Sequence, residues 1–298
     1  MTGAATDTGT ATELVTWGRR AWAALEAVHV PAYFSPEYRE EVKALGLRPS
    51  LAYFPVRAAA MGAVPAEVVE ATFYVFAPSL VRHVVPACWS VASPEQVLSA
   101  RHRAVEATLH RLLDPVVAEA PHALDEAVEL ARAACAGLRT AGHPLYAAHA
   151  ALPWPDDPWG QLWLAATLLR EHRGDGHVAA LVTHDLGPVE AMVTSLLAGS
   201  VVSEQFLRRS RGWTDDEWLA AAQRLRDRGL VTDADGSLSL TPDGVALRQA
   251  VEAATDAGAL CAWEHLGLDR TRRLAELVLP LRRAVEASGV LDVTRATA

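Results

Sequence analysis

The sequence predicts a mainly α-helical protein, with a multi-helix N-terminal region followed by a C-terminal winged helix-turn-helix that carries a small two-stranded wing. Two observations predict this fold. Over most of the 298 residues, Ala, Leu, Arg and Glu are abundant and apolar residues recur at helical spacing. Alternation of β-branched residues is nearly absent before Leu230, where two short runs flank the turn pair Asp235-Gly236 and predict one hairpin.

We expect three parts along the chain: a tail over residues 1–12, a helical domain over 13–198, and the winged helix with further C-terminal helices over 199–298. The tail, "MTGAATDTGTATE", is polar and lacks the basic and apolar regions of a signal peptide. It predicts a short mobile tail on a cytoplasmic protein. No run of about 20 uncharged apolar residues occurs, so we expect no membrane span.

The helical domain is predicted from periodicity and from helix-capping residues. Residues 13–27 form the first expected helix, and Ser35 with Pro36 begins a second that stops at Gly46. Further helices are expected over 65–86, 93–113 and 123–142. A proline-rich connection over 143–158 precedes a helix that is apolar nearly all round and is therefore expected in the core.

The winged helix is predicted between Val201 and Ala257 by the order of its elements. A helix precedes Trp213, and a second helix begins at the N-cap Thr214 and ends at Gly229. The hairpin follows, and then a helix capped near Thr241. This order and the "TPDG" pattern resemble the MarR type of winged helix.

The charge of this region disfavours conventional DNA reading. The recognition helix would begin with Asp215, Asp216 and Glu217, and the wing carries Asp233 and Asp235, whereas DNA phosphates attract cations. The net charge of -9 points the same way. Nucleic acid stays an alternative partner, through three arginines of the preceding helix: Arg208, Arg209 and Arg211.

Taken whole, the chain resembles an actinobacterial helix-turn-helix family of unassigned function. The residues that carry the resemblance are "FYVFAPSLVRHVVPACW", "LPWP", "LREHRGDGHVAAL", "TPDG" and "ATDAGALCAWEHLG". The resemblance implies a helical N-terminal region and a MarR-like winged helix at the C-terminal side. It implies no particular activity.

The stretch "LLREHRGDGHVAAL", residues 168–181, is the main candidate site. One interpretation is a helix end: cations in a last turn, Gly174 as the stop and Asp175 as the next N-cap. This leaves Glu171 and His177 unexplained. Because a carboxylate on a buried helix is costly unless paired, we expect Glu171 to have an Arg or His partner.

The alternative interpretation is a small-molecule site with acid–base chemistry. Its catalytic residues would be Glu171, Asp175 and His177. Arg170 and Arg173 would hold an anionic group, and other ligand-binding residues would be His149, Trp154 and Trp163. The winged helix would complete the pocket. Whether the protein is an enzyme stays open, and the cofactor is unknown.

Metal and thiol chemistry have little support. The spacing of His172, Asp175 and His177 matches no metal signature, so we expect no metal site. Cys88, Cys135 and Cys261 are expected to be free thiols.

Two other functions compete with the small-molecule site. The first is a ligand-responsive MarR-like transcriptional regulator that binds DNA. The second is an interaction protein that forms a homodimer through apolar residues spaced between Leu260 and Leu281.

Overall fold

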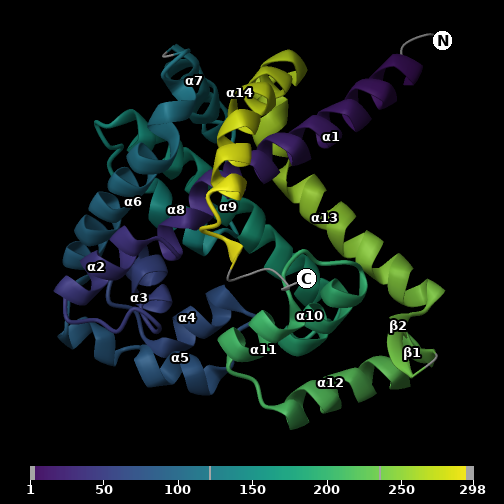
Figure 1. Cartoon of the computed structure of the whole chain (residues 1–298). Helices are drawn as coiled ribbons and strands as arrows, with labels where there is room; N and C mark the ends of the chain where they lie inside the picture. Colours follow the sequence, from purple (N-terminus) through teal and green to yellow (C-terminus); the bar gives the residue numbers. More distant parts are fainter. Residues whose placement is uncertain (1–3, 121, 235, 293–298) are drawn as a thin grey trace.

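The computed structural model describes residues 4–120, 122–234 and 236–292 and confirms a mainly α-helical fold with one small sheet (Figure 1). The helices of the first half are α1 (Ala4–His29), α2 (Pro36–Ala44), α3 (Tyr53–Ala58), α4 (Ala66–Phe73), α5 (Pro78–Val84), α6 (Pro94–Val117) and α7 (His122–Cys135). The second half has α8 (Pro144–Ala150), α9 (Pro158–Thr183), α10 (Pro188–Leu197), α11 (Glu204–Arg211), α12 (Asp215–Asp227), α13 (Pro242–Leu266) and α14 (Leu268–Ala287). Strands β1 (Val231–Ala234) and β2 (Ser237–Leu240) form the sheet, and 3-10 turns η1 (Val30–Tyr33), η2 (Ala59–Met61) and η3 (Ala87–Ser90) complete the elements.

Helix α9 is the central element, and it does not break at Gly174. It begins at the N-cap Asp157, whose side chain accepts from the Gly160 amide at 3.0 Å. The helix continues through Gly174 and Gly176 to Thr183. Its residues from Trp159 to Leu169 are almost all buried, which confirms the expected core helix. The interpretation of residues 170–175 as a helix end was wrong. Glycine is tolerated inside this helix because α7, α8 and α13 pack around it.

A first hydrophobic core joins α1, α6, α7, α9, α13 and α14. Helix α14 packs along α1, and Leu274, Val278 and Leu281 are buried in this core. The apolar residues that suggested a dimer surface between Leu260 and Leu281 are therefore largely used inside the chain. Helix α1 also reaches back to Ala4, into the range expected to be a tail.

A second core lies under α2–α5 and is rich in aromatic rings. Phe54 stacks on Phe73 with centroids 6.1 Å apart and meets Phe76 edge-on at 4.9 Å. Such pairs add about 0.5–1.5 kcal/mol each to the burial of the rings. This core gives the N-terminal half a rigid face toward the winged helix.

The winged helix contains the expected helix, helix, hairpin and helix, and packing adds α10 to it. Thr214 and Glu217 form the capping box of α12, and Val231 pairs with Leu240 in the antiparallel hairpin. Residue 235 of the expected turn lies outside the described residues. The core of this unit includes Val189 and Met192 of α10, so by packing it begins before residue 199. In Figure 1, α13 runs from the hairpin back to the helical bundle.

The winged helix is joined to the N-terminal half at the turn between α4 and α5. The Ala77 amide donates to the Arg211 carbonyl at 2.8 Å, and the Trp213 indole donates to the Val75 carbonyl at 2.9 Å. The Tyr74 hydroxyl donates to the Leu186 carbonyl at 2.6 Å. These bonds hold the C-terminal end of α11 against the aromatic core. Among the described residues, no helix has the length and apolarity needed to cross a membrane.

Candidate functional site

A large cavity lies between the N-terminal half and the winged helix. Its volume is about 1360 Å³, and it is lined by α1, η1, α3, α11 and α14 together with Arg170 of α9. Aromatic side chains from both halves form much of its wall: Trp22, Tyr33, Phe34, Tyr38, Tyr53, Phe54, Phe76 and Phe206. A cavity of this size with apolar walls and a few polar groups is the usual form of a small-molecule site.

The wall of this cavity is cationic although the whole chain carries a net charge of -9. Its lining residues include five arginines (Arg39, Arg170, Arg209, Arg211, Arg282) and two glutamates (Glu26, Glu286). Both glutamates already bind an arginine. Arg170 Nε donates to Glu26 at 2.9 Å, and Arg282 Nε donates to Glu286 at 3.0 Å.

Arg211, at the C-terminal end of α11, is a partly buried cation of the cavity wall. Its guanidinium lies 4.5 Å from the Phe76 ring centroid and 5.7 Å from that of Phe206. Its Nη1 donates to Ser210 Oγ at 2.9 Å, whereas its Nε is buried without a hydrogen-bond partner among the described residues. Burial lowers the pKa of this guanidinium from its ordinary value, while the nearby Tyr53 raises it.

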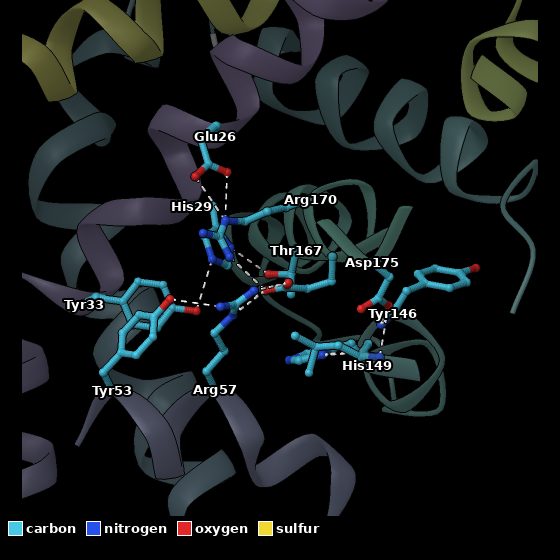
Figure 2. Close-up of polar contacts among 12 residues, drawn as sticks. Glu26, His29, Tyr33, Tyr53, Arg57, Tyr146, His149, Thr167, Arg170 and Asp175 are labelled. Carbon is cyan, nitrogen blue, oxygen red and sulfur yellow. Dashed lines mark hydrogen bonds and ion pairs between the residues drawn. The ribbon is translucent and has the colours of Figure 1, made fainter. Parts of the chain in front are cut away.

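Behind the cavity wall, Glu171 is the centre of a buried ion-pair group with Arg57 and Arg170. Figure 2 shows these two arginines next to each other. The Glu171 carboxylate is 1% exposed and accepts two bonds from Arg57, Nε to Oε1 at 3.0 Å and Nη2 to Oε2 at 2.5 Å. Arg170 Nη1 adds a third at 2.9 Å. Burial alone would raise the pKa of Glu171, but the two guanidiniums lower it below its ordinary value. The expected cationic partner is therefore confirmed, and the carboxylate is held in its charged form.

Tyr53 connects this group to the cavity. Arg57 Nη1 donates to the Tyr53 hydroxyl at 3.0 Å, and the Tyr53 side chain lines the cavity. Burial would raise the pKa of this phenol, but the charges of Arg57, Arg170 and Arg211 lower it from its ordinary value. The phenol is a polar group of the wall in a strongly cationic field.

His29 lies between Thr167 and Tyr33 of the cavity wall and is neutral. The Thr167 hydroxyl donates to the Trp163 carbonyl at 2.8 Å, so it accepts from His29 Nδ1 at 2.9 Å. His29 Nε2 then accepts from the Tyr33 hydroxyl at 3.1 Å. Burial, followed by the charge of Arg170, lowers the pKa of His29 well below its ordinary value, which agrees with this neutral tautomer.

His149 is buried on the other side of Glu171 and does not line the cavity. Its Nδ1 donates to the Leu145 carbonyl at 2.9 Å, so its Nε2 accepts from Arg101 Nη1 at 3.1 Å. Burial and the Arg101 charge lower the pKa of His149 to about 3. The contact is a structural one between α6 and α8.

Asp175 caps a helix, but a different one from that expected. Its Oδ2 accepts from the amides of Leu145 and Tyr146, both at 3.0 Å, at the N-terminal end of α8. This places a carboxylate at a positive helix end, which is favourable. Burial nevertheless raises the pKa of Asp175 to about 6.

The remaining residues predicted from the 168–181 stretch connect α9 to α13. Arg173 binds Asp256 at 2.8 Å, and His177 lies 2.9 Å from the Thr255 hydroxyl. Because that hydroxyl donates to the Val251 carbonyl, His177 Nδ1 is the donor to it. Burial lowers the pKa of His177. Asp175 and His177 point to different partners, so the structure does not bring the three expected catalytic residues together.

The two predicted pocket tryptophans pack in the helical core. Trp163 is buried, stacks on His29 with centroids 4.9 Å apart and lies under Arg101. Trp154 packs under Arg132 at the edge of the same core. Of the eight residues predicted for catalysis or ligand binding, Arg170 alone lines the cavity.

Sequence reasoning missed Tyr53 of the cavity wall and Arg57 behind it, which lie four residues apart on α3. It assigned Arg211, far away along the chain, to DNA instead. The "YFPVR" segment carries two polar side chains on one helix face among apolar residues, which is the one local signal that could have indicated them.

The three arginines proposed for DNA have different surroundings. Arg208 binds Glu204 at 2.6 Å and Asp215 at 3.1 Å. Arg211 points inward to the aromatic rings, and Arg209 is exposed at the cavity rim. The outer face of α12 presents Asp216 and Leu219, the latter 66% exposed. The first turn of α12, which would enter the major groove, therefore carries carboxylates instead of cations.

Thiol chemistry has no support in the geometry. Cys88 and Cys135 are buried free thiols, and burial raises their pKa values to about 11 and about 12. Within the described ranges, no group of three or more His, Cys, Asp or Glu side chains is arranged to hold a metal ion.

Comparison with known proteins gives one match. The model of a helix-turn-helix family matches residues 18–292, which is most of the chain, so the protein belongs to this family. No curated protein and no solved structure matches the chain.

Proposed function

We propose that this member of the helix-turn-helix family binds a small molecule in the cavity between its N-terminal half and its winged helix. The observation that carries the proposal is the cavity itself, about 1360 Å³ with aromatic walls from both halves. Its volume exceeds the roughly 300–1,000 Å³ of ordinary ligand pockets, so a drug-sized molecule fits. Glu171 and Arg57 support the wall from behind, whereas their neighbour Arg170 is part of the wall itself.

Acid–base catalysis by Glu171, Asp175 and His177 has less support than binding. Glu171 is held as a paired carboxylate, and Asp175 accepts from two backbone amides. A general base must reach the proton that it removes, and these side chains are not on the cavity wall.

A direct test uses the neutral fluorescent probe N-phenyl-1-naphthylamine. We expect it to bind the wild-type protein with a saturable rise in emission. Val30→Trp should weaken this binding at least about tenfold, because it places an indole in the cavity, and tenfold corresponds to about 1.4 kcal/mol. Leu219→Trp adds the same ring on the exposed face of α12 and is the matched control.

The proposal fails if the probe does not saturate, or if Val30→Trp binds it as tightly as Leu219→Trp does. Circular dichroism and thermal unfolding of both variants establish that each is folded.

A second candidate is a ligand-responsive transcriptional regulator. One observation favours it: α11, the helix before α12, contributes Phe206 and Arg211 to the cavity wall. A ligand that contacts α11 can favour one position of the winged helix over another, provided that it binds the two unequally. The acidic start of α12 and the pairing of Arg208 count against DNA as the partner.

Duplex DNA carrying the sequence upstream of the protein's own coding region distinguishes the two candidates. A regulator should bind this duplex at low salt, lose affinity steeply as salt rises, and be retained on heparin. Absence of both interactions at low salt removes the regulator and leaves the binding protein.

A further inference from the structure

We infer that the cavity ligand is an organic anion with a bulky apolar body, and that its acidic group binds Arg211. This inference rests on the proposed function, since it names the class of molecule that the cavity accepts. Three observations support it: the charge of the wall, the environment of Arg211, and the neighbouring phenol of Tyr53.

The charge of the wall favours an anion. Among the described residues that line the cavity, arginines outnumber glutamates by five to two. Glu26 is bound to Arg170 and Glu286 is hydrogen-bonded to Arg282, so the partly buried Arg211 has no carboxylate of the described wall beside it. Desolvated cations are costly unless an opposite charge accompanies them. A bound anion supplies that charge.

Arg211 is placed to receive the acidic group. Its side chain lines the cavity, and its guanidinium lies 4.5 Å from the Phe76 ring centroid and 5.7 Å from that of Phe206. Guanidinium groups bind oxyanions through two parallel bonds, and such charge-assisted bonds are roughly twice as strong as neutral ones. A carboxylate or sulfonate is therefore the acidic group that this arginine of the cavity wall would bind.

Tyr53 offers a further donor on the same wall. Its oxygen already accepts from Arg57 Nη1, so the direction of the phenol is set by the ion-pair group behind it. Its own proton can be donated to an oxyanion. The rings of Tyr33, Phe76 and Phe206 then face the apolar body of the ligand.

A pair of naphthalene probes tests the inference. 1-Anilinonaphthalene-8-sulfonate carries a sulfonate, and N-phenyl-1-naphthylamine is the same ring system without it. We expect wild-type protein to bind the sulfonate at least about tenfold more tightly than the neutral amine, against the negative charge of the whole chain.

The variant Arg211→Met should remove this preference. It keeps an unbranched apolar side chain against Phe76 and Phe206 but deletes the cation. The affinity for the sulfonate should fall at least about tenfold while the affinity for the neutral amine stays within about twofold. Arg208→Met is the matched control, because it deletes an arginine of the same helix outside the cavity, and it should change neither affinity.

The outcomes separate the inference from the proposed function. If the neutral probe binds and Val30→Trp blocks it, but Arg211→Met weakens both probes equally or neither, the cavity binds ligands and the anion inference is wrong. If neither probe saturates, the proposed function fails and the inference fails with it.

Discussion

Arginines gather on both sides of Tyr53, and their partners differ. On the α9 side, Arg57 and Arg170 share Glu171, and Arg170 also binds Glu26. On the α11 side, Arg211 lies between aromatic rings and has no carboxylate partner in the described part of the chain. The arginines on the α9 side are therefore paired with carboxylates within the chain, whereas Arg211 on the α11 side is not.

This difference distinguishes a stabilising charge group from a binding one. A paired buried carboxylate contributes to stability only while its cations are present, and removal of one member leaves an uncompensated charge. An unpaired buried cation costs stability in the empty protein and gains a partner when an anion binds. Substitutions in the two groups should therefore change stability by different amounts and affect ligand binding differently.

The largest effect should come from Glu171→Gln. This variant keeps the shape of the side chain but leaves Arg57 and Arg170 without their shared carboxylate. We expect the free energy of unfolding to fall by about 3–5 kcal/mol in urea titrations. Glu70→Gln, which breaks the surface pair with Arg82, should cost less than about 1 kcal/mol.

Arg211→Met in the same assay sharpens the comparison. It removes a cation with no carboxylate partner, so its free energy of unfolding should stay within about 1 kcal/mol of the wild-type value. Equal losses of stability for Glu171→Gln and Arg211→Met would contradict the distinction between the paired arginines beside Glu171 and the unpaired Arg211.

Acidification should weaken the helical region through its neutral histidines. Burial lowers the pKa of His149 to about 3 and that of His172 to about 4, and it lowers the pKa of His29 well below the ordinary 6.5. Below pH 6.5 the unfolded chain therefore binds more protons than the folded one, and the free energy of unfolding decreases as the pH is lowered.

Asp175, whose folded pKa is raised to about 6, acts in the opposite direction and offsets part of this loss. Between pH 7.5 and 5.5 we expect a net loss of about 3 kcal/mol in the free energy of unfolding. His149→Gln, which keeps one donor and one acceptor, should make the pH dependence shallower. A stability that is flat over this range contradicts the neutral assignment.

A smaller effect should follow from Asp175→Ala. This variant removes the acceptor for the first amides of α8 and should cost about 1 kcal/mol or somewhat more. Asp175→Asn keeps an acceptor oxygen without the buried charge, so its stability at pH 7.5 should equal or exceed that of the wild type. If both variants lose the same free energy, the carboxylate charge rather than the cap matters.

The smallest effect should be a gain from Gly174→Ala. A Cβ at this position would lie 3.7 Å from Glu171 Oε2, which is an ordinary contact, and the residue is inside a continuous helix. Alanine should raise the free energy of unfolding by about 0.5–1 kcal/mol. A loss would instead indicate the helix end that the sequence suggested.

Features of the fold that depend on residues close together in the sequence could be predicted, and those that depend on packing between distant residues could not. The N-caps Thr214 and Ser35 and the pairing of the hairpin strands are local, and each was found where the pattern placed it. The break at Gly174 was wrong because propensity for glycine is a weak local preference, and the packing of α8 and α13 on α9 outweighs it.

The candidate site was predicted in part. Burial on an apolar helix required that Glu171 be paired, and it is. The partner Arg57 lies 114 residues away, and Arg211 reaches the same wall from a different unit. With one sequence, nothing in the spacing of these residues indicates that they share a cavity.

The sequence by itself determined the helical class, the winged hairpin and the need for a cation beside Glu171, because each follows from periodicity, capping or the cost of a buried charge. The tertiary structure decided which arginines meet carboxylates and which face the cavity. It also decided that α10 packs with the winged helix and α14 with α1. Those outcomes depend on long-range packing, in which side chains distant along the chain exclude water from the same space.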